Sequence, residues 1–229
     1  MSNEDYSQPL FNALPPAVVA LALAIFGIEL VFMAGARGYV GGPEAIGWRV
    51  TAINDFGFFN QAVHWMFQRG EVRMDLLSRF VTYPFVHASF TQAIFVIVFL
   101  LALGKLVGEV FGNLSVLILF FACGIFGALV YSGLAGADRI LIGGFPSVYG
   151  LIGAYTFLLW IRYGATGENQ YQAFTLIGFL LGIQLVFGVL FGSNNDWIAE
   201  LAGFALGFVL TPMLVPGAFR RLIQRMRQR

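Results

Sequence analysis

Few residues in the apolar parts of this chain could do nucleophilic or acid–base chemistry. Ser147 lies in the segment GGFPSVYGLIGAY, and Glu200 lies in WIAELAGFALG. A serine hydroxyl becomes an effective nucleophile when a neighbouring base removes its proton. The chain has two histidines, His64 and His87, and neither follows Ser147 in the sequence. Chemistry at Ser147 would therefore need Glu200 or one of these distant histidines as its base.

Metal-binding side chains are sparse. Cys123 is the single cysteine, so a disulfide and a thiolate metal site are both excluded. The two histidines do not form HExxH or another zinc-binding pattern. The chain also has no glycine-rich phosphate loop and no basic aromatic surface for nucleic acid. We therefore expect no metal, no cofactor and no nucleic-acid partner.

Apolar helices must position these residues. Of the 229 residues, 59% are hydrophobic and 11% are charged, which is typical of an integral membrane protein and not of a soluble domain. A helix needs about 20 residues to cross a hydrocarbon layer roughly 30 Å thick. The apolar runs predict an all-α membrane protein, a bundle of six transmembrane helices. The expected spans are Pro16–Gly35, Phe85–Leu106, Leu114–Gly133, Ser147–Tyr163, Phe174–Gly192 and Asp196–Val215.

Residues 36–84 form the long connection between the first two spans, which we call the L1 segment. Within it, Phe59, Val63, Met66 and Phe67 recur at helical spacing, with polar residues opposite. Such a stripe is typical of an amphipathic helix that lies in the membrane interface. The L1 segment is therefore predicted to lie against the lipid bilayer.

The chain divides into residues 1–15, an N-terminal segment, residues 16–215, the membrane domain, and residues 216–229, a basic tail. Five arginines occur among the last ten residues. Basic clusters of this kind are retained on the cytoplasmic side and can meet anionic headgroups. Six spans then place both termini in the cytoplasm. The L1 segment holds five further arginines that would be translocated, but long loops follow this rule poorly.

Two carboxylates and several glycines lie inside the predicted spans. A charge at the centre of a membrane helix costs about 2.5–3.5 kcal/mol on insertion scales, so Glu29 and Glu200 should face protein. Each could serve a proton path or a recognition site, or could be hydrogen-bonded for packing alone. Small residues at helix-face spacing allow backbones to approach closely, which predicts tight packing among the last three spans. These glycines are Gly150, Gly153, Gly178, Gly182, Gly188, Gly192, Gly203 and Gly207.

The order of these segments resembles the rhomboid intramembrane proteases over roughly residues 36–210. The most specific piece is SRFVTYPFVHASF, which is similar to the family run Trp-Arg-x-x-Thr-x-x-Phe-x-His. Arg79, Thr82, Phe85 and His87 match this run, and Ser78 replaces the tryptophan. The resemblance implies six spans as in the bacterial core, and with it a place in the bacterial inner membrane.

Rhomboids use a serine nucleophile on the fourth span and a histidine base on the sixth. The family motif Gly-x-Ser-Gly-x-x-Tyr/Phe aligns with Gly143 and Tyr149, which puts Phe145 at the nucleophile position and Pro146 at the following glycine. Glu200 takes the histidine position. A phenyl ring cannot attack a carbonyl, and proline has no N–H to offer a developing oxyanion. The resemblance therefore implies no catalytic residue at the family's positions.

The two other oxyanion-hole positions hold Gln92 and Val96. The resemblance thus implies a pseudoprotease that, like iRhoms and derlins, binds transmembrane helices of client proteins without cutting them. We expect the binding site to involve His87, Gln92, Val96, Phe145, Tyr149 and Glu200. One alternative is an atypical serine endopeptidase that uses Ser147 with Glu200 or His87. Another is a non-enzymatic subunit of a larger membrane complex, and the oligomeric state stays open.

Overall fold

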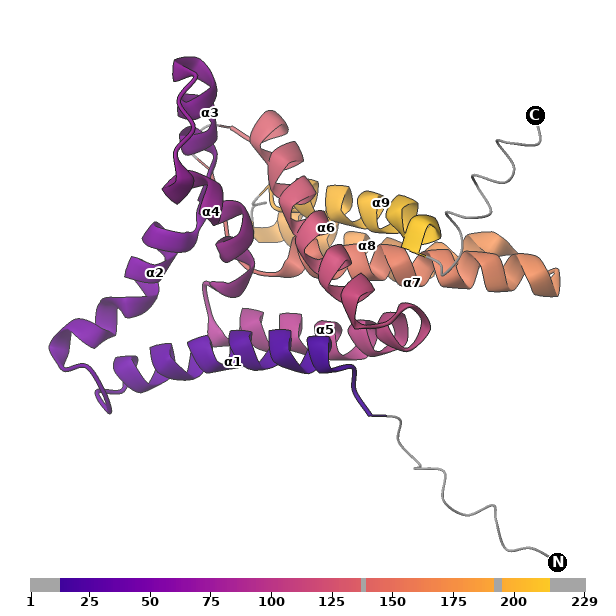
Figure 1. Ribbon diagram of the computed structural model, residues 1–229, viewed down its shortest axis with the longest axis horizontal. Coiled ribbons are helices and arrows are strands. Elements are labelled where there is room, and N and C mark those ends of the chain that lie inside the picture. Colours follow the sequence, from indigo (N-terminus) through magenta and orange to yellow (C-terminus); the bar gives the residue numbers. More distant parts are fainter. Residues whose placement is uncertain (1–12, 137–138, 192–194, 215–229) are drawn as a thin grey trace, which may run out of the picture.

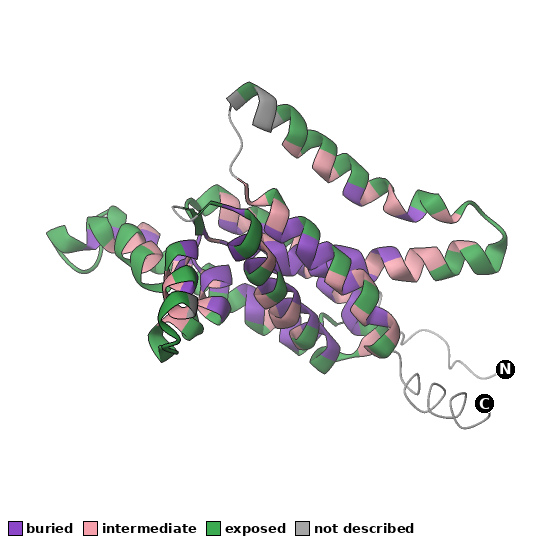
Figure 2. Cartoon of the chain, turned by 90° about the horizontal axis from the view of Figure 1, so that it is seen from above, coloured by how far each residue is buried: buried purple, intermediate pink, exposed green. Residues whose placement is uncertain are grey.

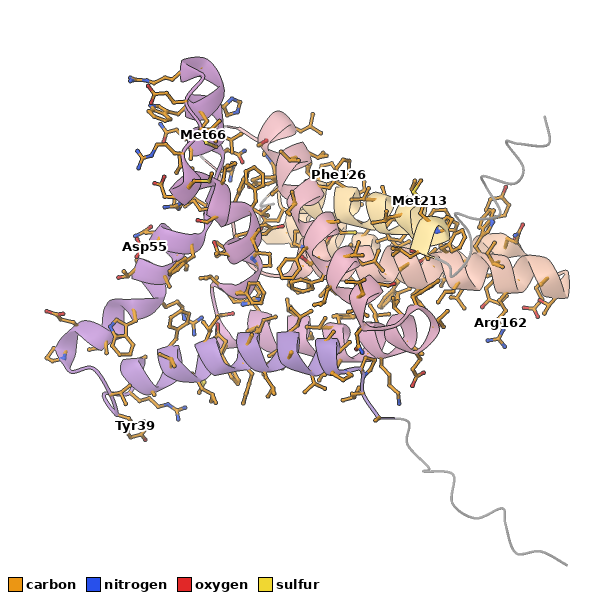
Figure 3. All side chains as sticks on the ribbon, in the orientation of Figure 1. Tyr39, Asp55, Met66, Phe126, Arg162 and Met213 are labelled. Atoms are coloured by element: carbon orange, nitrogen blue, oxygen red, sulfur yellow. The ribbon has the colours of Figure 1, made fainter. Side chains whose placement is uncertain are left out.

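The computed structural model describes residues 13–136, 139–191 and 195–214, and these residues are mostly helical (Figure 1). The predicted basic tail, residues 216–229, and all but the last three residues of the N-terminal segment lie outside the described ranges. Figure 3 places the charged residues Asp55 and Arg162 far apart, near opposite ends of the molecule. The helices between them carry mainly apolar side chains, as a membrane bundle requires.

Six long helices overlap the six predicted spans, so the all-α prediction is confirmed. By length and composition, α1, α5, α6 and α9 could each cross a membrane. The other two are α7, whose hydropathy is lower, and α8, which has 17 residues. The six helices are α1 (Pro16–Ala36), α5 (Phe90–Phe111), α6 (Asn113–Leu134), α7 (Phe145–Thr166), α8 (Thr175–Phe191) and α9 (Trp197–Leu214).

The second span begins at Phe90 and not at the predicted Phe85. Tyr83–Phe85 forms a short 3-10 turn, η2, in which Pro84 occupies an early position. Ser89 then caps α5, because its Oγ accepts a hydrogen bond from the Gln92 N–H at 3.2 Å. Serine at this position satisfies a backbone donor that has no partner within the helix. The apolar residues at positions 85 and 86 therefore precede the helix, and hydropathy alone does not separate them from it.

The L1 segment folds into several short elements. They are η1 (Pro43–Gly47), α2 (Trp48–Phe56), β1 (Phe58–Phe59), α3 (Asn60–Arg69) and α4 (Met74–Thr82). The amphipathic helix predicted here is confirmed as α3, whose Val63 is buried and whose Met66 packs on a core cluster. At its start, the Asn60 amide donates to the carbonyls of Tyr131, Ala135 and Gly136 at the end of α6. L1 is thus fastened to the bundle.

A two-stranded sheet also ties L1 to the segment before α7. Strand β1 pairs antiparallel with β2 (Ile140–Leu141), with Phe58 opposite Leu141 and Phe59 opposite Ile140. Phe58 and Leu141 are both buried. Because β2 lies four residues before α7, this pairing helps to place the start of α7.

The core is built around α7, which packs against α9 and α6. A Cβ atom on Gly207 would overlap the Gly150 carbonyl oxygen, and one on Gly153 would overlap the Phe204 carbonyl oxygen. The backbones of α7 and α9 are therefore in direct contact, as small residues at a membrane helix interface permit. The tight packing predicted from these glycines is confirmed for these two helices.

The same prediction is wrong for α8. A Cβ atom on Gly178 or Gly182 would meet nothing within 4 Å. The main neighbour of α8 is η3 (Gln170–Phe174), and Figure 2 shows α8 at the edge of the molecule with an exposed outer face. Two glycines four residues apart share a helix face, but their spacing does not say which way that face points. Gly192 lies outside the described residues, and the burial of Gly188 is not described.

Candidate functional site

His87 holds the loop that precedes α7. Its side chain is fully buried, and its Nε2 accepts a hydrogen bond from the Gly144 N–H at 3.3 Å. In the same loop, the Gly143 N–H donates to the Tyr83 carbonyl at 3.0 Å. Gly143 adopts a φ of 90°, which favours glycine because a side chain is strained there. These bonds fix the backbone on the N-terminal side of Phe145.

Gln92 and Val96 converge on this loop from α5. A Cβ atom on Gly143 would stand 2.9 Å from the Gln92 Nε2, and one on Gly144 would stand 2.8 Å from the Val96 Cγ1. The Gln92 Oε1 accepts from the Ala88 N–H at 2.8 Å, so this side of the amide serves the start of α5. Three of the sequence-predicted site residues are thus brought together around two glycines.

Phe145 is the first residue of α7, and its half-buried ring packs on the main hydrophobic core. Proline is well suited to the second position, where no N–H is needed for the helix, and Pro146 occupies it. A Cβ atom on Gly203 would overlap the Pro146 carbonyl oxygen, so α9 lies directly against the start of α7. An aromatic ring and a proline therefore form the start of α7, directly against α9.

Ser147 faces α6. Its side chain is fully buried, and a Cβ atom on Gly124 would stand 2.5 Å from its Oγ. Among the residues that the structure describes, the Ser147 hydroxyl has no hydrogen-bond partner. The nearby Tyr83 hydroxyl donates to the Gly124 carbonyl at 2.7 Å. Neither Glu200 nor His87 is hydrogen-bonded to Ser147, so the arrangement that would activate a serine is not formed.

Glu200 and Tyr149 belong to a second polar group, which includes a residue that the sequence did not single out. The Glu200 side chain is 4% exposed and accepts a hydrogen bond from the Gln184 amide of α8. The Tyr149 side chain of α7 lies beside the same carboxyl. One carboxyl group therefore meets polar groups from two other helices. Gln184 is a polar residue within an otherwise apolar helix, and this is the sequence signal that could have identified it.

Glu29 is buried, as predicted, and its partner is Arg49 of L1. The Arg49 guanidinium binds the carboxylate with both nitrogens, Nη1 to Oε1 at 2.9 Å and Nη2 to Oε2 at 2.7 Å. Its Nη1 also donates to the His87 carbonyl at 2.8 Å. The pair connects α1, α2 and the His87 loop. This favours a packing role for Glu29 over a proton path. L1 contains five arginines that could pair with Glu29, and the sequence alone does not identify Arg49 among them.

Burial lowers the pKa of His87 to about 4, and the neighbouring Arg49 charge acts in the same direction. The imidazole is therefore neutral at pH 7, which leaves Nε2 free to accept from Gly144. A histidine in an unfolded chain has a pKa near 6.5. Acid protonates the unfolded state first, so stability falls as the pH drops below that value.

Lowering the pH from 7 to 5 is expected to reduce the free energy of unfolding through His87 by about 2 kcal/mol. Denaturation in mixed detergent micelles, followed by far-UV circular dichroism, measures this change. His87→Gln keeps an acceptor for the Gly144 N–H and does not titrate. If the stability of the wild type and of this variant depended equally on pH, His87 would not be the group that makes the protein less stable in acid.

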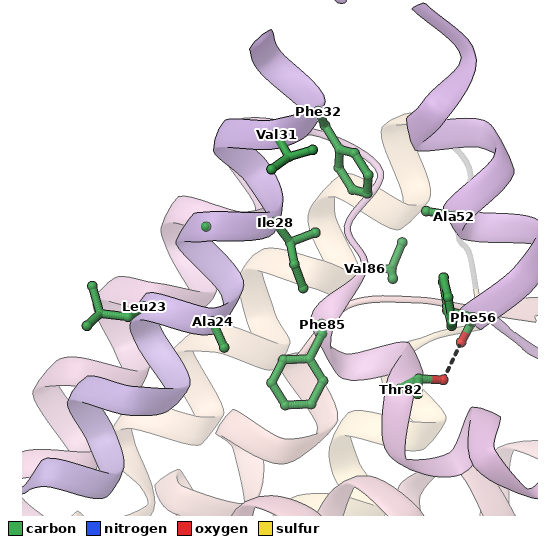
Figure 4. Close-up of a pocket in the computed structure, with 11 residues that line it drawn as sticks. Leu23, Ala24, Ile28, Val31, Phe32, Ala52, Phe56, Thr82, Phe85 and Val86 are labelled. Atoms are coloured by element: carbon green, nitrogen blue, oxygen red, sulfur yellow. Dashed lines mark hydrogen bonds between the residues drawn. The ribbon is translucent and has the colours of Figure 1, made fainter. Parts of the chain in front are cut away.

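An apolar cavity of about 620 Å³ lies between α1 and L1 (Figure 4). Ile28 and Phe32 of α1 and Phe56 of α2 line it, together with Phe85 and Val86, which precede His87. Its lining holds no charged side chain. In the described part of the chain, no three His, Cys, Asp or Glu side chains are grouped to hold a metal ion.

The part of the chain that contains the site is similar to known proteins. The profile of the family described as Rhomboid domain matches residues 75–217, more than half of the chain. A protein of Bacillus subtilis (strain 168) named "Putative rhomboid protease YdcA" is 25% identical over 144 residues. That alignment covers 62% of this chain and 70% of the Bacillus protein. The family profile match includes the His87 loop together with α7 and α9.

Proposed function

Because the chain belongs to the rhomboid family, we propose that it is a pseudoprotease, which binds transmembrane helices of partner proteins without cleaving them. It would aid the assembly, stability or turnover of those partners. The observation that carries this proposal is the state of Ser147, which is fully buried with no hydrogen-bonded base. Loss of the nucleophile or base of a serine protease lowers turnover by a factor on the order of 10⁶.

The proposed client surface lies along α5 and α8. Both helices expose large apolar side chains, including Phe95 and Val98 of α5 and Phe179 and Leu185 of α8. Gln92 and Glu200 lie further inside and could hydrogen-bond a polar or unwound part of a client helix. Such bonds contribute about 0.6–2 kcal/mol each inside membranes. A few of them are enough to favour one partner over another.

Purified protein in liposomes is expected neither to cleave a reporter transmembrane helix nor to react with a fluorophosphonate probe at Ser147. The physical reason is that the buried hydroxyl has no base to remove its proton. Ser147→Ala is the matched control, and its signal should equal that of the wild type. Labelling or cleavage that disappears in Ser147→Ala would instead support the atypical endopeptidase.

A photo-crosslinking amino acid at Phe95 or Phe179 is expected to capture the transmembrane segment of a partner in the native membrane. The control position is Leu23 of α1, which is 62% exposed, close to the 64% of Phe179. Mass spectrometry of the crosslinked peptides identifies the captured segment. Equal capture at all three positions would mean ordinary lipid-facing surfaces and would contradict a client site on α5 and α8.

A further inference from the structure

A single polar contact joins α8 to α9 among the residues that the structure describes. The Gln184 Nε2 donates to the Glu200 Oε2. Otherwise the inward face of α8 presents apolar side chains, such as Ile177, Leu180 and Leu181, and the helix packs mainly on η3 at its start. Gln184 therefore supplies the polar part of the contact between the middle of α8 and α9.

The acceptor atom of Gln184 shows which form of Glu200 fits the site. The Gln184 Oε1 is buried and has no hydrogen-bond partner in the described structure. A carboxamide offers both donors and an acceptor, whereas a carboxylate offers acceptors alone. An ionised Glu200 therefore leaves Oε1 unsatisfied, which is costly for a buried polar atom. A neutral Glu200 accepts from Nε2 and donates its own proton to Oε1, so both groups are satisfied.

The surroundings of Glu200 contain few other titratable groups. Tyr149 of α7 lies beside the carboxyl. Asp196, one turn earlier, contacts the Tyr131 hydroxyl of α6 at 3.4 Å, and the positive charge of Arg139 lies close to Asp196. From α8 the facing polar group is Gln184. No basic side chain described on these helices is ion-paired with Glu200, so a carboxylate there has no countercharge.

We propose that neutral Glu200 and Gln184 form a carboxyl–carboxamide clasp that holds α8 against α9, and that loss of the Glu200 proton releases α8. The O–H bond of Glu200 breaks, and the proton passes to solvent water. The clasp itself is independent of the proposed function. Its consequence, that release of α8 exposes the client surface, rests on that function.

The distance between α8 and α6 tests the clasp. Spin labels at Leu185 and Leu134, 70% and 71% exposed, are placed in a Cys123→Ala background and measured in nanodiscs by pulsed electron paramagnetic resonance. The wild-type clasp is expected to give one narrow distance at pH 5.5 and a second population at pH 8.5. A wild-type distribution that does not change with pH would overturn the proposal.

Two variants test separately the role of the Glu200 proton and the role of the contact between Gln184 and Glu200. Glu200→Gln forms an amide–amide pair that does not titrate, so it should keep the narrow distance at both pH values. Gln184→Leu removes the clasp and should show the second population at both. A pH response that persists in Glu200→Gln, or a narrow distance in Gln184→Leu, would overturn the assignment. Labels at Leu134 and Ile161 of α7 form the control pair, whose distance must stay constant if the rest of the bundle is folded.

Crosslinking from Phe179 then tests the consequence separately. If release of α8 exposes the client surface, capture should increase from pH 5.5 to pH 8.5 in the wild type and stay constant in Glu200→Gln. A distance that changes with pH while capture does not would support the clasp and contradict its link to client binding. Failure of the clasp and failure of its link to client binding therefore give different experimental results.

Discussion

Replacing Gly207 with alanine is expected to destabilise the protein by about 3 kcal/mol or more, because the added methyl group would overlap the Gly150 carbonyl oxygen. The obstacle is backbone, which cannot rotate away as a side chain can. The helices α7 and α9 would have to separate, and α9 would then lose its contact with the start of α7 at Pro146. Both core packing and the site depend on this close approach.

Gly182→Ala provides the matched control for Gly207→Ala. Gly182 also lies inside a helix, but a Cβ atom there meets nothing within 4 Å. Alanine is favoured over glycine in a helix interior by roughly 0.5–1 kcal/mol, so this variant should be as stable as the wild type or slightly more stable. Thermal denaturation in detergent, followed by far-UV circular dichroism, compares the two. Equal destabilisation by both variants would contradict direct backbone contact between α7 and α9.

Replacing Glu29 with glutamine is expected to cost about 3–5 kcal/mol of stability, because it leaves the Arg49 guanidinium without its buried countercharge. The Glu29 side chain is 0% exposed, whereas that of Arg49 is 23% exposed. Arg49→Met should have a larger effect than Glu29→Gln, since it leaves the fully buried carboxylate unpaired and also releases the His87 carbonyl. Reversible unfolding in mixed micelles measures both.

The double variant Glu29→Met/Arg49→Met separates the ion pair from its components. Replacing a buried pair with apolar side chains is often neutral, so the double variant should be more stable than the sum of the single changes predicts. The exposed pair of Arg73 and Asp75, whose side chains are 55% and 56% exposed, is the comparison. Its loss should cost about 0–1 kcal/mol. Equal losses of stability for the two pairs would contradict the conclusion that the Glu29–Arg49 pair is buried inside the protein.

Some features of the fold could be predicted because they depend on composition and local pattern. Long apolar runs must form helices in a membrane, since hydrocarbon offers no partners for backbone N–H and C=O groups. The spans and the amphipathic helix α3 were recognisable for this reason. Boundaries were less predictable: the apolar residues Phe85 and Val86 belong to η2 and to the loop before α5, because Pro84 and the Ser89 cap decide where the helix begins.

The sequence by itself determined that this is an apolar helical bundle of rhomboid type. It also predicts, from the family resemblance, that Phe145 and Glu200 stand where the family has its serine and histidine. Both inferences depend on residue identity and spacing alone. The tertiary structure decided that Arg49 pairs with Glu29, that Ser147 faces Gly124 and that Gln184 meets Glu200. It also decided that Gly178 and Gly182 of α8 face outward. Such contacts depend on how each helix is rotated and packed. Residues far apart in the chain set that rotation jointly, so no single segment specifies it.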